Sequence, residues 1–278
     1  MYFYGRLTVL LKKEIMTKQQ LEQFKKWFYG YVATFYGNDE LTNDNIKLKE
    51  DHTRRMCVDI QQIADELGLN NNQKMLAETI ALFHDVGRFE QFMKYHSYND
   101  VGTENHSLIG LKVLAEKRIL DCLSKEEKEI VETAIRFHGD KNLPAGLSGE
   151  IELFSKLIRD IDKLDIYYVM ASRFDDLRNN PEKYFPTFGY QAKNKCSKNI
   201  IDAVLKNQTI DYGELKSLND MVIAMLGWVT DINFAAVLKE IKKRKLLEQM
   251  IAFLPDTEDI RKVAEHLHKQ LNGRILKN

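Results

Sequence analysis

The chain has 278 residues, of which 44% are hydrophobic and 29% are charged, enough to bury one large core or two modest ones. Its 41 basic residues balance its 41 acidic ones, so composition provides no general attraction to nucleic acid or to an anionic membrane. Cys57, Cys122 and Cys196 suit neither a disulfide framework nor a CxxC zinc site, so we expect a protein of the reducing cytoplasm. No apolar stretch approaches the roughly 20 residues of a membrane span.

The first fifteen residues, MYFYGRLTVLLKKEI, lack the basic start and the small-residue cleavage site of a secretory signal. Directly after them, Thr17 and Gln20 form a T-x-x-Q capping box ahead of an apolar stripe that runs from Leu21 to Phe35. We therefore expect ordered structure to begin at Met16, which is also a candidate for the natural start.

Apolar residues recur at spacings of three and four along most of the chain, and there are only four prolines. This pattern predicts an all-α protein. Ser124 and Glu127 form a second capping box, and Thr103 is the expected N-cap of its helix. The expected helices cover residues 17–35, 45–68, 71–84, 88–95, 103–120, 124–137 and 150–177, with several more after residue 196.

One irregular stretch, NNPEKYFPTFGYQAKNK, covers residues 179–195 and is predicted to be a long loop. It is either a surface connection packed by its own aromatic residues or a lid that contacts a substrate. We find no internal repeat or linker, which favours one domain over residues 1–278. That domain would comprise an N-terminal helix in residues 17–44, a core in residues 45–178, and a loop with C-terminal helices in residues 179–278.

Five ionisable residues extend the apolar stripes of these helices inward, and a sixth follows one of them directly. A buried carboxylate without a partner costs several kcal/mol, and buried imidazoles need partners too. One such histidine would fit an ordinary core, but four with two aspartates predict a metal site, because imidazole and carboxylate are ligands of Fe, Mn, Zn, Co and Ni. The six residues are His52, His84, Asp85, His106, His138 and Asp162.

The neighbours His84 and Asp85 have a geometric use of their own. Successive helical residues point about 100° apart, so the pair can hold one ion from two directions, or the carboxylate can lean toward a second ion. Asp85 is therefore a candidate bridge between two metals.

These residues resemble the H…HD…D signature of the HD-domain metal-dependent phosphohydrolases. His52, the His84-Asp85 doublet and Asp162 match the signature, and His106 and His138 match the two extra histidines of the dinuclear subgroup. The resemblance covers about residues 45–173 and includes the contexts LFHDVGR and AIRFHGDK. It implies an HD-domain helical bundle with a C-terminal helical extension. In that family one ion would be held by His52, His84, Asp85 and Asp162, and the other by Asp85, His106 and His138.

The resemblance implies two divalent transition-metal ions, Fe or Mn first, with Zn, Ni, Co or Mg as alternatives. The expected reaction is hydrolysis of a phosphate ester of a nucleotide or another small phosphorylated metabolite by metal-bound hydroxide, with Asp85 as the central catalytic residue. The resemblance also favours Lys163 as a contact to substrate phosphate. Arg88 would either bind the phosphate or pair with a carboxylate, Lys141 would be exposed, and Asp165 would orient a ligand or a water molecule.

The remaining histidines, His96, His266 and His268, lie off the inward stripes and are not assigned to the metal. A di-iron oxygenase with the same ligand pattern and a nucleotide-sensing regulatory module are the alternative functions. A long nucleic-acid substrate is disfavoured by the neutral charge. The sequence leaves the substrate, the metal and a possible homo-oligomer open, and it places specificity in residues 179–195 and the C-terminal helices.

Overall fold

A computed structural model describes residues 16–100, 102–179 and 195–277. Within these ranges the regular structure consists of helices, with no β-strand, which confirms the predicted all-α class. The α-helices are α1 Lys18–Ala33, α2 Glu40–Glu66, α3 Asn71–Phe83, α4 Gly87–Tyr95, α5 His106–Glu116, α6 Lys125–Phe137, α7 Gly149–Asn179, α9 Lys198–Leu205, α10 Leu218–Leu226, α11 Ala235–Lys243, α12 Leu246–Phe253 and α13 Glu258–Lys277. Three short 3-10 helices are η1 Ile119–Cys122, η2 Tyr212–Glu214 and η3 Gly227–Thr230.

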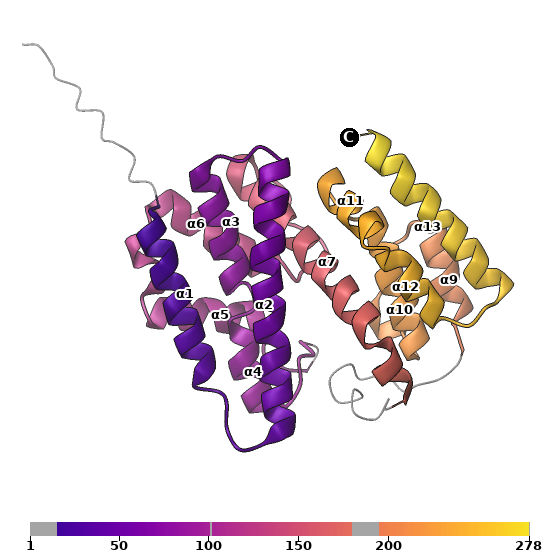
Figure 1. Ribbon diagram of the computed structural model, residues 1–278, viewed down its shortest axis with the longest axis horizontal. Helices are drawn as coiled ribbons and strands as arrows, with labels where there is room; N and C mark the ends of the chain where they lie inside the picture. The colour runs from indigo at the N-terminus through magenta and orange to yellow at the C-terminus, as the bar shows by residue number, and fades with distance from the viewer. Residues whose placement is uncertain (1–15, 101, 180–194, 278) are drawn as a thin grey trace, which may run out of the picture.

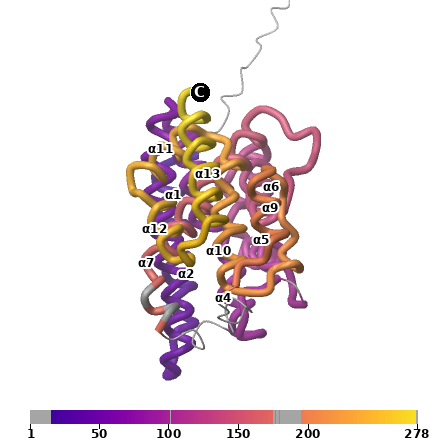
Figure 2. Tube along the Cα trace, turned by 90° about the vertical axis from the view of Figure 1, so that its right-hand side faces the viewer, coloured from indigo at the N-terminus to yellow at the C-terminus, as the bar shows by residue number. Residues whose placement is uncertain are grey.

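Helix α7 runs between two groups of helices, with α1–α6 on one side and α9–α13 on the other (Figure 1). Viewed from the right-hand side of Figure 1, the C-terminal helices lie in front of the N-terminal ones (Figure 2). The helix can serve both groups because its apolar residues occupy more than one face: the neighbours Leu157 and Ile158, which point about 100° apart, are both fully buried. That the chain forms a single domain stays a prediction.

The helix starts show how local hydrogen bonding sets the boundaries. Both predicted capping boxes are present, at Thr17 with Gln20 and at Ser124 with Glu127. Glu127 also accepts a hydrogen bond from the backbone N–H of Met16, at 2.9 Å, which ties the start of the described chain to α6. Residues 1–15 lie outside the described residues, so the natural start at Met16 stays a prediction.

Two predicted helix starts were wrong. Helix α2 begins at Glu40 rather than at residue 45, because Asp39 caps it by accepting a hydrogen bond from the backbone N–H of Thr42 at 2.8 Å. Helix α5 begins at His106 rather than at Thr103, because Asn105 is the N-cap. The hydroxyl of Thr103 instead donates to the carbonyl oxygen of Asn99, at 2.7 Å. The expected helix 103–120 also ends early, and η1 follows it.

Helices α4 and α5 approach each other closely at Gly87. A Cβ atom at this position would lie 2.1 Å from the carbonyl oxygen of His106 and 2.5 Å from the backbone nitrogen of Gly110. Only a glycine therefore allows this contact, which brings the first residue of α5 next to the turn after α3. The packing of α4 on α5 thus sets the position of His106.

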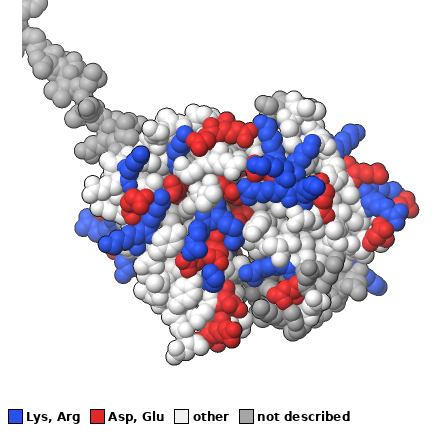
Figure 3. Space-filling view, in the orientation of Figure 1, with Lys and Arg blue, Asp and Glu red and all other residues white. Residues whose placement is uncertain are grey.

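Charged side chains of both signs lie next to one another on the face shown in Figure 3, in keeping with a net charge of zero. An ion pair links the two groups of helices: Arg244, the C-cap residue of α11, donates to Asp59 of α2 at 2.7 and 2.9 Å. None of the described helices combines the length and apolar character that a membrane span requires. The predicted loop 179–195 falls almost wholly outside the described residues, which omit 180–194.

Candidate metal centre

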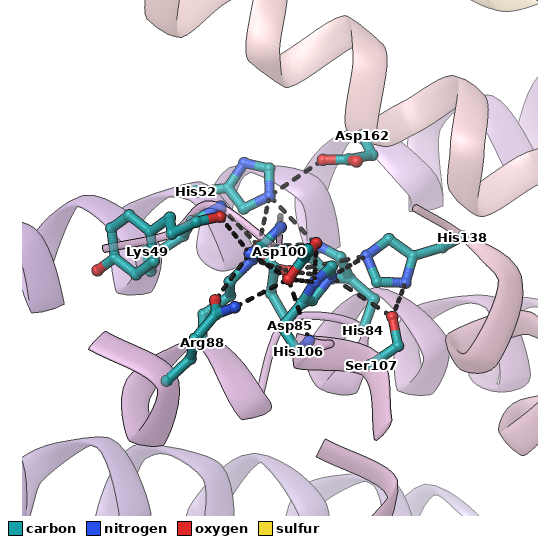
Figure 4. Close-up of polar contacts among 12 residues, drawn as sticks. Lys49, His52, His84, Asp85, Arg88, Asp100, His106, Ser107, His138 and Asp162 are labelled. Carbon is teal, nitrogen blue, oxygen red and sulfur yellow. Dashed lines mark hydrogen bonds and ion pairs between the residues drawn. The ribbon is translucent and has the colours of Figure 1, made fainter. Parts of the chain in front are cut away.

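The six candidate ligands come from five helices and converge on one place (Figure 4). His52 lies within α2, and Asp162 lies within α7. His84 and His138 are the C-cap residues of α3 and α6, and His106 is the first residue of α5. Buried apolar residues lie beside these positions along the helices, such as Met56 after His52 and Ile80 before His84, so packing of the stripes carries the polar side chains into a shared centre. Asp85 follows His84 in the turn between α3 and α4.

Asp85 presents one carboxylate oxygen to each of two histidine pairs. Its Oδ2 lies 3.6 Å from Nε2 of His52 and 3.5 Å from Nε2 of His84. Its Oδ1 lies 3.3 Å from Nε2 of His106 and 3.7 Å from Nε2 of His138. All five side chains are buried. The two oxygens of one carboxylate therefore face two separate groups of donor atoms, the geometry expected of a bridging ligand.

Within each pair the two histidine Nε2 atoms face each other. The distance is 3.1 Å between His52 and His84 and 3.0 Å between His106 and His138. Asp162 joins the first group, with its Oδ1 at 3.3 Å from Nε2 of His52. Its side chain is 19% exposed, so it lies at the open edge of the centre.

The opposite ring nitrogen of each histidine is held from behind. Nδ1 of His84 lies 2.8 Å from the carbonyl oxygen of Ala81, and Nδ1 of His138 lies 2.7 Å from that of Ile135. A carbonyl oxygen can only accept, so these Nδ1 atoms carry the proton, and in the neutral ring Nε2 presents a lone pair. Both histidines thus offer a lone pair to the centre.

The other two histidines are held by carboxylates. Nδ1 of His52 lies 2.6 Å from Asp165, and Nδ1 of His106 lies 2.8 Å from Asp100. With neutral rings, four Nε2 lone pairs and the oxygens of Asp85 would meet in a buried space that only a cation or a proton can satisfy. Nitrogen and oxygen donors in this arrangement fit divalent metal ions.

The pKa shifts of these residues reflect two effects, burial and the charged groups nearby. Burial alone would raise the pKa of Asp85, but Lys49 and then His84 hold it well below its usual range. Burial lowers the pKa of His84, and burial together with Arg88 lowers that of His106 to about 3, so both rings stay neutral. Burial also opposes the charged form of His52, but hydrogen bonds to Asp162 and Asp165 outweigh it and raise the pKa of His52 to about 9.

Two cations stand beside Asp85. The ammonium group of Lys49 lies 2.8 Å from its Oδ2, and Nε of Arg88 lies 3.4 Å from its Oδ1. Arg88 also donates to the carbonyl oxygen of Tyr98 at 2.6 Å and to Asp100 at 3.2 Å. Of the two roles expected for Arg88, pairing with carboxylates is therefore the one present here. Lys49 was not among the residues predicted from the sequence, although it lies one helical turn before His52 on α2.

Asp165 lies behind His52, with its Oδ2 at 2.6 Å from Nδ1 of the ring, and Arg55 holds it in place. The Arg55 guanidinium donates to both oxygens of Asp165, at 2.6 and 2.9 Å. Neither Arg55 nor Asp100 was predicted from the sequence to take part in the site. Arg55 lies one turn after His52 on α2, a spacing that could have been noticed, whereas Asp100 lies in the connection between α4 and α5, where no periodicity applies.

Lys163 faces a cavity of about 580 Å³ that opens beside the metal centre. Its ammonium group is paired with Asp231, which lies in the segment after α10. Lys141 also lines this cavity and is exposed, as expected. Nearby, the buried Arg159 donates to the carbonyl oxygens of Phe137 and His138, both at 3.2 Å, and so fixes the end of α6 that carries His138.

The three histidines that were not assigned to a metal lie outside both groups of donor atoms. His266 bonds to the side chain of Asn207 at 2.8 Å, and His268 lies 3.9 Å from Glu248. His96 ends α4 in a left-handed conformation, with φ of 50°.

Residues 50–167 match the family model of the HD domain. The matched region contains all six candidate ligands, Asp165 behind them and Lys163 at the cavity, and it ends within α7. Searches of curated proteins and of solved structures found no match. Because the family match ends at residue 167, the helices after α7 lie outside it.

Proposed function

We propose that this chain hydrolyses a phosphate ester of a small metabolite. Its residues 50–167 match the HD domain, and the superfamily of that domain consists mostly of metal-dependent hydrolases. The proposed substrate is a nucleotide or a similar phosphorylated compound, and the proposed cofactors are two divalent ions, Fe or Mn first. The proposed location is the cytoplasm.

One observation carries the proposal: the two oxygens of Asp85 face two separate pairs of histidine Nε2 atoms. A single ion would need only one of these groups. Two divalent ions supply Lewis acidity, which makes water a stronger nucleophile and neutralises negative charge on phosphoryl oxygens. Hydrolysis of a phosphate ester needs both effects.

The surrounding side chains have distinct proposed roles. Asp85 bridges the two groups, while Asp165 and Asp100 hold the rings of His52 and His106 from behind. Lys163 lines the cavity, where its ammonium group would bind substrate phosphate after leaving its partner Asp231. Lys49 and Arg88 limit the negative charge at Asp85.

A small substrate suits the charge distribution better than a long nucleic acid. Basic and acidic side chains are intermixed on the face in Figure 3, whereas a protein that follows a phosphate backbone presents a basic stripe. The cavity volume of about 580 Å³ falls in the range of about 300–1,000 Å³ that is usual for small-molecule sites.

The test combines metal analysis with an activity assay. Protein purified without chelator should contain bound divalent metal and release phosphate from members of a panel of nucleotides and sugar phosphates. His138→Ala should lose one of the two ions and the activity, and His268→Ala, a histidine outside the centre, should lose neither. Wild-type protein without bound metal, or metal-loaded protein that releases no phosphate from the whole panel, would contradict the proposal.

A di-iron oxygenase is the second candidate, since four histidines around a bridging carboxylate also suit a pair of iron ions. The two functions differ in their need for oxygen. Phosphate release that is equal with and without oxygen supports the hydrolase, and oxygen consumption that accompanies product formation supports the oxygenase.

A further inference from the structure

The cavity beside the metal centre has two walls of different chemistry. Of its described lining residues, every lysine and arginine lies between residues 49 and 163. A second wall comes from residues 207–231, which lie outside the matched HD-domain region. Apart from Asp211 and Asp231, this second wall consists of uncharged side chains, including amides, hydroxyls and two aromatic rings. An anionic group would thus bind on the first wall, and an uncharged group on the second.

Trp228 is the fixed aromatic surface of the second wall. Tyr167 of α7 stacks behind its ring, with centroids 5.9 Å apart and an interplanar angle of 26°. Tyr167 is fully buried, and its hydroxyl donates to the carbonyl oxygen of Met225 at 2.8 Å. Trp228 lines the cavity together with the small residues Ala224 and Gly227. The ring is therefore held in one orientation next to open space.

Gln208 supplies hydrogen-bonding groups on the same wall. Its backbone N–H donates to the carbonyl oxygen of Ala203 at 2.9 Å, and the preceding Asn207 is held by His266 at 2.8 Å. The Gln208 side chain lines the cavity, is exposed, and makes no hydrogen bond within the described part of the chain. A primary amide offers two donors and an acceptor, which can pair with a planar ligand that carries both kinds of group.

We propose that residues 207–231 form the binding site for the base of a nucleoside monophosphate, with Trp228 stacking on the base and Gln208 contacting its edge. This assignment rests on the proposed function for the position of the phosphate. Every nucleobase has a π-face that stacks on an aromatic side chain, and its edge combines donors with acceptors. A sugar phosphate without a base would use neither feature.

The charges of the cavity favour one phosphate group over three. Its lining contains six aspartates and five lysines or arginines. Two divalent ions would turn this small excess of negative charge into a modest positive one, which suits a phosphate dianion. A triphosphate carries about twice that negative charge and would have to pass carboxylates such as Asp211 and Asp231.

The inference can be tested with ligands that cannot be hydrolysed. Trp27→Phe leaves Trp228 as the sole tryptophan of the chain, because there are two in all. In the full-length, metal-loaded Trp27→Phe protein, adenosine or cytidine should quench the fluorescence saturably, and ribose should not. By calorimetry, Trp228→Leu and Gln208→Ala should each weaken nucleoside binding about tenfold or more. Trp27→Phe should bind as the wild type does.

The outcomes separate this inference from the phosphohydrolase proposal. If ribose binds as well as the nucleosides, or if Trp228→Leu leaves nucleoside affinity unchanged, the base site is wrong even when sugar phosphates are hydrolysed. If nucleosides bind through Trp228 but no phosphate ester is cleaved, the base site stands and the hydrolase proposal fails. Trp228→Leu should raise the KM for nucleoside monophosphates about tenfold. The KM for ribose 5-phosphate should stay unchanged.

Discussion

The carboxylate of Asp100 holds both the ring and the backbone N–H of His106. The carboxylate oxygens lie 2.8 and 3.0 Å from Nδ1 of the ring, and one of them also accepts from the backbone N–H of His106 at 3.2 Å. The contact at Nδ1 leaves Nε2 free to point toward Asp85. Nearby Arg88 donates to the same carboxylate at 3.2 Å. A residue in a connection between helices therefore orients a proposed ligand at the start of a helix.

We expect Asp100→Asn to weaken metal binding at the group formed by Asp85, His106 and His138 by about 10- to 100-fold, since groups that orient a metal-binding histidine have effects of this size. The group around His52 should keep its affinity. A two-step metal titration of the purified variant measures both. Glu104→Gln, an exposed residue of the same connection that pairs with Lys94, is the matched control. Unchanged affinity at both steps would show that Asp100 does not orient His106.

Asp85→Asn should reduce the metal content more than the loss of any single histidine. Its oxygens face both groups, so the neutral amide weakens both, whereas His138→Ala should affect one. Metal analysis after gel filtration should give about two ions per chain for the wild type, about one for His138→Ala and close to none for Asp85→Asn. Asp121→Asn, an exposed carboxylate that pairs with Arg118, serves as control. Two ions retained by Asp85→Asn would rule out the bridge.

Metal affinity should rise with pH up to about 9. Without metal, the pKa of His52 is about 9 and the pKa values of His84 and His106 are lowered, so at neutral pH His52 is the protonated ring among these three. An ion must displace that proton, and the competition weakens as pH rises toward the pKa and ends above it. Calorimetric titrations in buffers of different ionisation enthalpy should record about one proton released per first ion at pH 7. A metal affinity that does not change between pH 6 and 9 would contradict the assignment of this proton to His52.

Gly87→Ala should destabilise the protein by about 1–3 kcal/mol or more, the range for overpacking a tight contact. The new Cβ atom would lie 2.1 Å from the carbonyl oxygen of His106, so α4 and α5 must separate. Gly30→Ala is the control, because this exposed position in α1 has no atom within 4 Å of its added Cβ. That change should stabilise by about 0.5–1 kcal/mol. Urea unfolding monitored by circular dichroism measures both, and equal effects would mean that α4 and α5 tolerate separation.

The helical architecture was largely predictable because its signals are local. Spacings of three and four mark the buried stripe of each helix, and capping boxes such as Ser124 with Glu127 mark its start. The errors arose where several capping residues stood close together. Thr103 and Asn105 are both suitable N-caps, and the choice depended on the hydroxyl of Thr103 finding the carbonyl oxygen of Asn99. That contact exists only once the connection has folded.

The candidate ligands were predictable for a related reason. A buried ionisable residue on an apolar stripe stands out in the sequence, and His52, His84, His138 and Asp162 lie at helical spacings from buried neighbours. The residues that hold them do not stand out. Asp100 lies where no periodicity applies, and Asp231, the partner of Lys163, follows 68 residues later in the chain. Their roles depend on distances between segments that the sequence alone does not provide.

The sequence by itself therefore determined the all-helical class and the five ionisable residues that extend inward, with Asp85 beside one of them, because both follow from periodicity within single helices. Only the tertiary structure decided that the two oxygens of Asp85 face different histidine pairs, that Lys49 and Arg88 flank it, and that residues 207–231 are the ones that line the cavity beside the metal centre. These relationships join residues from different helices, and they are set by how the helices pack against one another.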